Sequence, residues 1–404
     1  MAISKPCYAA FVIGGENGWQ LSTDGIVDVF ATYASTSKLP SGARTLSLLS
    51  VGGTENTYDQ RFGVGVGLLP SVIAFNVKAP TTNGVDSSVR VGIYPNLQNK
   101  AATGGANRFE TSPSIDFREF FYTAKGAYGE LLAGRALNLY QGKNILNDMT
   151  LLTSGTIPGN AFRGGTTLGH IGYGYLYTNF GPQIRYTTPE MGGVKVALEI
   201  AEPYKISADT GKTNSPRVET EISYAGKLGA MTTQAWLSGL YQTAPRSDTA
   251  AARPGKDNQS IGGAAGASAG LGGANVMLSG YYGKGLGMVS AQDGDFLGST
   301  STDANGNERK HWGYLLQTTY QLTSSVKVGA NYGQSRQDKN DKEPAYGAAN
   351  PVVIKNQESA VFMIAYNLNK FTQFVAEYIY AQNTWMDGAK QHSNQFALGT
   401  MFYW

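Results

Sequence analysis

Six charged residues in the first half of the chain are the strongest candidates for a functional site. A guanidinium group stays charged at any physiological pH and attracts anions, so an arginine-rich set is suited to steering charged solutes. Each arginine of the set lies in or beside a segment in which polar and apolar residues alternate. The candidates are Arg90, Arg118, Arg135, Arg185, Lys143 and Asp148.

Motifs that would indicate catalysis or metal binding are weak. Gly266-Ala-Ser-Ala-Gly270 matches a hydrolase nucleophile motif, but its Gly/Ala-rich surroundings predict a strand and a turn rather than a strand-to-helix turn. His170, His311 and His392 lie far apart and lack metal-ligand spacing, and we expect His170 to be a solvated loop residue. The single cysteine, Cys7, excludes an intramolecular disulfide. We expect no enzyme activity, no cofactor and no metal site.

The strands that carry the arginines have two distinct faces, because alternate side chains of a strand point in opposite directions. Arg90 alternates with Val89 and Val91, and Arg185 shares a face with Gln183. Arg135 ends a predicted strand just before a long connection. The next set is expected to share one face, with Glu119 on the other: Asp116, Arg118, Phe120 and Tyr122. Acids expected on the polar faces of other strands are Asp28, Glu199, Glu219, Glu221 and Glu377.

The composition excludes several classes of protein. Charged residues make up 15% of the 404 residues, against about 25% in typical soluble domains. Mean hydropathy is −0.24, too low for a helical membrane protein. The longest uncharged stretch, 259–283, is rich in glycine and reads as two strands rather than a membrane helix. A net charge of +3 gives no indication of nucleic-acid binding.

Segments of about ten alternating residues recur along the chain, separated by seven short turns and eight long connections, which predicts sixteen strands. We find no blade-length repeat of a propeller. A barrel of sixteen strands has a lumen too wide to fill with its own side chains, so the polar faces are expected inside and the apolar faces toward lipid. The last strand alternates as far as Trp404, which fits an interfacial aromatic that anchors a closing strand.

Three segments form a recognisable series along the chain: Leu21-Ser-Thr-Asp-Gly-Ile-Val-Asp-Val29, Gly129-Glu-Leu-Leu-Ala-Gly-Arg135 and Gln183-Ile-Arg-Tyr-Thr-Thr-Pro-Glu-Met-Gly-Gly193. They resemble segments of general bacterial porins, the trimeric sixteen-stranded channels of the Gram-negative outer membrane. Their order and spacing make the resemblance more specific than any one motif. It covers residues 18–404 as one barrel domain, and leaves residues 1–17 as an N-terminal extension that does not read as a signal peptide.

The resemblance implies an all-β fold: an antiparallel transmembrane β-barrel with an inward-folded third loop, here residues 138–178. It also implies a homotrimer in contact with outer-membrane lipid and lipopolysaccharide, and it places Arg118 at a constriction position of the family. The six charged candidates would then line the constriction. One acid, Asp148, facing several cations predicts an anion-leaning channel for small hydrophilic solutes.

Two other functions stay open at this stage. One is a substrate-specific channel, for example for dicarboxylates, sugars or aromatic acids, and saturation of flux would distinguish it from a general pore. The other is an outer-membrane adhesin or enzyme, for which the sequence offers no candidate site. At a subunit interface, an outward Glu119 would find a partner that lipid cannot supply.

Overall fold

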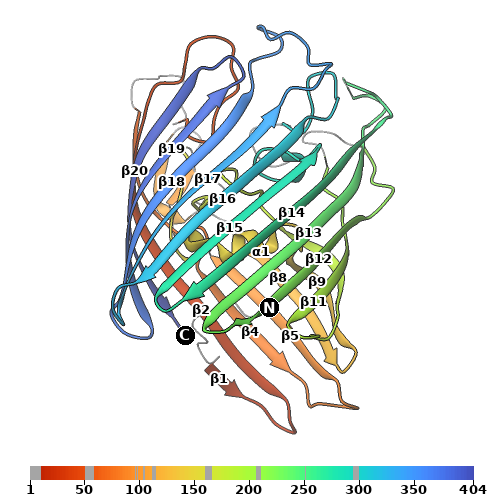
Figure 1. The fold of residues 1–404 in the computed structure, drawn as a ribbon, viewed down its shortest axis with the longest axis vertical. Coiled ribbons are helices and arrows are strands. Elements are labelled where there is room, and N and C mark those ends of the chain that lie inside the picture. The colour runs from red at the N-terminus through yellow and green to blue at the C-terminus, as the bar shows by residue number, and fades with distance from the viewer. Residues whose placement is uncertain are drawn as a thin grey trace.

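The computed structural model describes residues 11–50, 59–95, 97, 99–102, 105–111, 115–159, 166–205, 211–250, 252–293 and 300–404. Figure 1 shows a barrel of tilted antiparallel strands. The strands of its wall are β2 (Gln20–Thr36), β3 (Gln60–Gly65), β4 (Val72–Lys78), β5 (Asp86–Pro95), β8 (Ile115–Gly126), β9 (Gly129–Leu137), β10 (Phe180–Thr187), β11 (Val194–Ala201), β12 (Arg217–Leu228), β13 (Met231–Pro245), β14 (Asp257–Leu271), β15 (Ala274–Lys284), β16 (Lys310–Gln321), β17 (Val326–Asp338), β18 (Ile354–Asn367), β19 (Thr372–Trp385) and β20 (Lys390–Tyr403).

The sheet closes on β2, which makes a barrel of sixteen strands, as predicted. On one side β2 pairs with β4 and then with β3, which are two parts of one barrel strand interrupted between them. On its other side β2 pairs with β20, from Ile26 opposite Tyr403 to Thr36 opposite Ser393. Backbone hydrogen bonds between Gly25 and Trp404, one in each direction, complete this seam.

Three short strands lie outside this count. β1 (Phe11–Gly14) pairs with the first residues of β2, and Figure 1 shows it beyond the rim that holds the C-terminus. The other two, β6 (Asn99–Ala102) and β7 (Gly105–Thr111), form a hairpin in one of the long connections. β1 belongs to the predicted N-terminal extension, of which residues 1–10 lie outside the described part of the chain.

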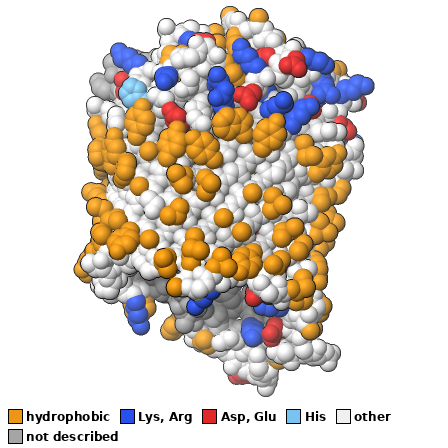
Figure 2. Space-filling view, in the orientation of Figure 1, with side chains coloured by type: hydrophobic (Ala, Val, Ile, Leu, Met, Phe, Trp, Pro, Cys, Tyr) orange, Lys and Arg blue, Asp and Glu red, His pale blue; other side chains and the backbone are white. Residues whose placement is uncertain are grey.

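The outer face of the barrel is apolar, because strand parity places the hydrophobic side chains there. On β11 and β12 the exposed set includes Leu198, Ile200 and Ile222, as predicted, and their alternates point inside. Figure 2 shows hydrophobic side chains spread over the outer surface, with lysine, arginine and acidic side chains gathered beyond its upper edge. Among the described residues we find no helix with the length and apolar character to cross a bilayer.

In the part of the chain that the structure describes, helical structure is confined to the long connections. The segment between β9 and β10 contains α1 (Gly142–Asn147) and a 3-10 turn, η1 (Met149–Leu152), and a second 3-10 turn, η3 (Ala291–Asp293), lies between β15 and β16. Asp148 caps η1 by accepting a hydrogen bond from the backbone N–H of Thr150. Figure 1 shows α1 at mid-height of the barrel.

Candidate pore and its charged wall

Side chains of the barrel wall accept backbone hydrogen bonds from the connection 138–178. Glu219 on β12 accepts from Tyr140 N at 2.7 Å, and Gln317 on β16 accepts from Met149 N at 2.6 Å. Glu377 on β19 accepts from Ser154 N at 2.8 Å, and its other oxygen accepts from the Thr153 hydroxyl at 2.7 Å. On β20, Gln395 accepts from Ile157 N at 2.8 Å. The inward faces of four separate strands therefore hold one connection.

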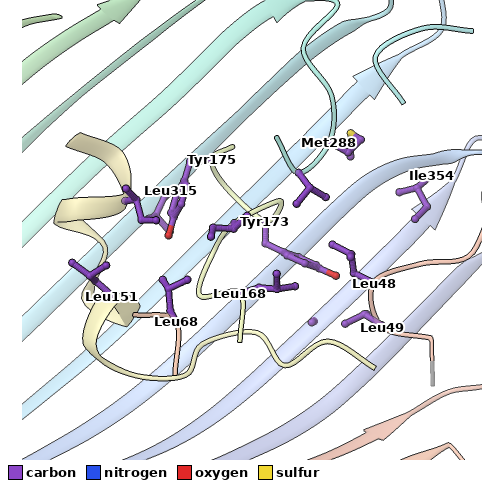
Figure 3. Packing of buried hydrophobic residues seen from close by; sticks show 14 of the residues in the cluster. Leu48, Leu49, Leu68, Leu151, Leu168, Tyr173, Tyr175, Met288, Leu315 and Ile354 are labelled. Atoms are coloured by element: carbon purple, nitrogen blue, oxygen red, sulfur yellow. The ribbon is translucent and has the colours of Figure 1, made fainter. Parts of the chain in front are cut away.

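An apolar cluster continues this attachment. Figure 3 shows Leu151, Leu168, Tyr173 and Tyr175 of the connection packed with Leu315 of β16, with Ile354 of β18 and with side chains of other connections. All six are less than a tenth exposed. Inward side chains from the middle of β13 through β20 are covered in the same way, so the wide lumen expected from the strand number is partly filled by packed connections.

The wall formed by β2, β4, β5 and β8 is less completely covered and carries a row of paired charges. Arg90 on β5 donates from Nη1 and Nη2 to the carboxylate of Asp24 at 2.8 and 3.1 Å, and from Nε to Glu119 at 2.9 Å. Asn76 accepts a further hydrogen bond from Nη1 at 3.0 Å. The side chains of Asp24, Arg90 and Glu119 are 31%, 24% and 19% exposed, so solvent reaches this wall.

Arg118 lies above this group. Its Nη2 is 2.8 Å from Asp116 Oδ2, and its Nε donates to the same oxygen at 3.0 Å. The guanidinium carbon lies 4.7 Å from the ring centroid of Tyr94 and 5.6 Å from that of Phe180, within the range of cation–π contact. We call Asp24, Arg90, Glu119, Arg118 and Asp116 the charge ladder. With two arginines and three acids, its formal charge is one negative unit.

A β-bulge in β8 overturns part of the predicted parity. The register with β5 shifts between Gly92 and Tyr94, so that Glu119 lies opposite Gly92 and Asp116 lies opposite Tyr94. Arg118 and Glu119 consequently both face inside. The prediction that Glu119 faces outward was wrong, and so was its suggested role at a subunit interface. Phe120 and Tyr122, expected inside, are instead exposed on the outer face.

Arg185 and Lys143, like Arg135, are predicted cations that form no ion pair among the described residues. Arg185 faces inside from β10, opposite Glu199 of β11, and donates to the carbonyl of Leu137 at 3.2 Å. Lys143 lies in the first turn of α1. Burial lowers the pKa of its ammonium group, the nearby Glu221 carboxylate opposes this, and the charges of Lys195 and Arg185 lower it further. Both cations are partly exposed.

Behind these cations lies the glutamate cluster, which we define as Glu199, Glu219 and Glu221 with Arg217. Glu199 and Glu219 face each other directly across β11 and β12, and their exposures are 0% and 1%. Arg217 Nε is 2.9 Å from Glu219 Oε1, although without hydrogen-bond geometry, and Nη2 is 3.9 Å from Glu199 Oε1. The Tyr204 ring covers the guanidinium at 4.0 Å. Parity predicted these inward faces correctly.

Asp148 does not line an opening, contrary to prediction. It is 4% exposed, and its Oδ2 accepts from the Tyr175 hydroxyl at 2.7 Å and lies 3.7 Å from His170 Nδ1. Burial alone would raise the pKa of its carboxyl, but the interaction with the His170 ring and the hydrogen bond from Thr150 outweigh burial and lower it. His170, expected to be solvated, is fully buried. This group braces the connection.

Arg135 also falls outside the candidate pore. The register places it opposite Phe120 of β8 and Pro182 of β10, on the outward face, where its Nη1 donates to the carbonyl of Phe180 at 2.7 Å. Sequence parity could not show this, because the preceding residues Leu131 and Leu132 are apolar on both faces. Asp24, by contrast, was not among the predicted pore residues, although the alternation along β2 places its side chain inside the barrel.

The closed barrel, its apolar outer band and its charged inner wall define a channel of the bacterial outer membrane. The family model for Gram-negative porins matches residues 2–385, and the chain belongs to that family. No curated protein sequence matches the chain significantly.

Solved structures with this fold share little sequence with the chain. The outer-membrane channel DcaP of Acinetobacter baumannii has a TM-score of 0.67 at 14% identity, covering 98% of this chain and 100% of its own. A structure described as an anion-selective porin from Comamonas acidovorans has a TM-score of 0.65 at 15% identity, covering 96% and 100%. The trimer form of OmpT from Vibrio cholerae has a TM-score of 0.55 at 12% identity, covering 96% and 100%.

Proposed function

We propose that this protein is a homotrimeric porin through which small hydrophilic solutes diffuse passively, with a preference for anions. The connection 138–178 folds into each barrel and narrows it, and the pathway runs between that connection and the wall of β2 to β10. The hydrogen bonds from Glu219, Gln317, Glu377 and Gln395 support this position of the connection. Trimeric relatives of the same fold support the assembly.

One observation carries the anion preference: Arg185 and Lys143 are partly exposed and make no ion pair with any described residue. An unpaired cation at a narrow point attracts anions and repels cations, whereas Arg90 and Arg118 are largely neutralised by their partners. The fold shared with a porin described as anion-selective is consistent with this assignment. Asp148 and Arg135 are not part of the proposed constriction.

Reversal potentials in a salt gradient across planar bilayers test the proposal. The native channel is expected to pass chloride more readily than potassium. Arg185→Glu should reverse or strongly reduce this preference, because it replaces a cation by an anion at the lumen. Arg135→Glu is a matched control, since it makes the same exchange one strand away on the outward face. A cation-selective native channel, or equal shifts in both variants, would overturn the anion preference.

The alternative of a substrate-specific channel predicts saturation. Dicarboxylates, sugars and aromatic acids added to the bath would then block ion current at concentrations where flux levels off. A general porin shows flux proportional to concentration over the same range.

A further inference from the structure

The bulge in β8 places two consecutive residues of opposite charge on the inner face. In regular alternation only one of Arg118 and Glu119 could face the lumen. The register shift between Gly92 and Tyr94 admits both. Bulges often re-aim side chains in this way beside functional sites.

The pocket that receives Glu119 is fitted to a carboxylate. Its Oε2 accepts hydrogen bonds from Tyr94 Oη at 2.6 Å and from Arg90 Nε at 2.9 Å. Gly92 lies directly opposite, and a Cβ atom at that position would come within 2.9 Å of the same oxygen. The glycine therefore leaves the space that the carboxylate fills.

Glu119 changes the electrostatics of the ladder. Without it, Arg90 and Asp24 form a neutral pair beside the neutral pair of Arg118 and Asp116. With it, the ladder carries one excess negative charge on a wall that is partly open to solvent. This negative charge belongs to a residue of the barrel wall beside the arginines. It does not come from the connection 138–178, where the sequence analysis expected the acid.

We propose that Glu119, placed inside by the β8 bulge, is a selectivity-determining residue that weakens the channel's preference for anions by adding a negative charge beside the pair of Arg90 and Asp24. Asp24 acts with it as the second partner of the same guanidinium. This assignment rests on the proposed function as a channel. It concerns a shift in selectivity, and it therefore holds for either sign of the native preference.

The test compares reversal potentials of the full-length protein and three variants in the same salt gradient. Glu119→Gln keeps the shape and an acceptor for Tyr94 but removes the charge. It should raise the anion-to-cation permeability ratio about four-fold, because one unit charge at about 10 Å in water changes permeation about two-fold, in opposite directions for anions and cations. Asp24→Asn should shift the ratio in the same direction, which provides a second readout if Glu119→Gln assembles poorly.

Tyr94→Phe is the control for a purely structural role. It removes a hydrogen bond to Glu119 but no charge, so the melting temperature should fall while the permeability ratio stays unchanged. An unchanged ratio in both Glu119→Gln and Asp24→Asn would overturn the inference. A native channel selective for cations would instead overturn the proposed anion preference, while a shift in Glu119→Gln would still support the role of Glu119.

Discussion

Two regions of the inner wall contain the same residue types but differ in what those residues do. The charge ladder on β2, β5 and β8 and the glutamate cluster on β11 and β12 each combine arginine with carboxylates. Ladder side chains are 19% exposed or more, whereas those of the cluster are nearly inaccessible. Solvent exposure distinguishes the two groups. An exposed ion pair can act on passing ions, whereas a buried ion pair holds the barrel wall and the connection together.

Removal of the buried arginine should have the largest effect. Arg217→Met leaves Glu199 and Glu219 facing each other without a cation, and breaking a buried pair costs about 3–5 kcal/mol. Arg118→Met makes the same exchange on the ladder, where exposure limits the loss to about 1 kcal/mol. Thermal unfolding followed by circular dichroism compares the two. Equal losses would remove the distinction between the regions.

The attachment at Glu377 should be the next most sensitive. Glu377→Ala removes the acceptor for Thr153, Ser154 and Gly155, which leaves buried donors unsatisfied at about 1–3 kcal/mol. We expect a looser connection and hence a noisier open-channel current. Single-channel recordings measure this, with Gln373→Ala on the same face of β19 as the control. A current as quiet as the native one would argue against a restraining role.

The stability that Asp148 contributes to the connection 138–178 should depend on pH. Its pKa is lowered in the folded protein, so its contribution to stability is complete above the ordinary aspartate pKa, about 4, and is lost as pH falls through the lowered value. Asp148→Asn should lower the melting temperature at neutral pH and reduce its decline under acid. A native-like decline in the variant would show that other carboxylates account for it.

The smallest predicted effect concerns Lys143. Because its pKa is lowered, the ammonium group loses its proton at a lower alkaline pH than an ordinary lysine does. The anion-to-cation permeability ratio should therefore fall by about four-fold at most as pH rises through that range, since the lost charge acts in opposite directions on anions and cations. Lys143→Arg keeps the charge and should abolish the dependence. Reversal potentials measured up to alkaline pH provide the readout.

The sequence predicted the barrel well where alternation is strict. On β11 and β12 each outward position is apolar or threonine and each inward position is polar or alanine, so parity gave the faces of Glu199 and Glu219 directly. The lipid outside and the water or polar contacts inside impose this pattern on every such strand. The seam at Trp404 followed from the same reasoning.

The predicted orientation of side chains was wrong where a strand is apolar on both faces or where a β-bulge interrupts the alternation. The stretch from Phe117 to Tyr122 contains aromatics at both parities, so the bulge that turns Glu119 inward leaves no signal in the sequence. Asp148 and His170 were misjudged for another reason. Polar residues in a long connection resemble solvated loop residues until tertiary packing encloses them.

The seam between β2 and β20 also bears on how the barrel is made. Ile26 pairs with Tyr403, so the two edges of the sheet come from opposite ends of the chain. Until they meet, β2 and the growing sheet each present unpaired backbone groups, which favour association with other chains. Contacts of such long sequence separation form slowly. Biogenesis should therefore depend on protection of both edges until the final strand arrives, and weakening the seam at Gly25 should reduce yield more than it alters the finished channel.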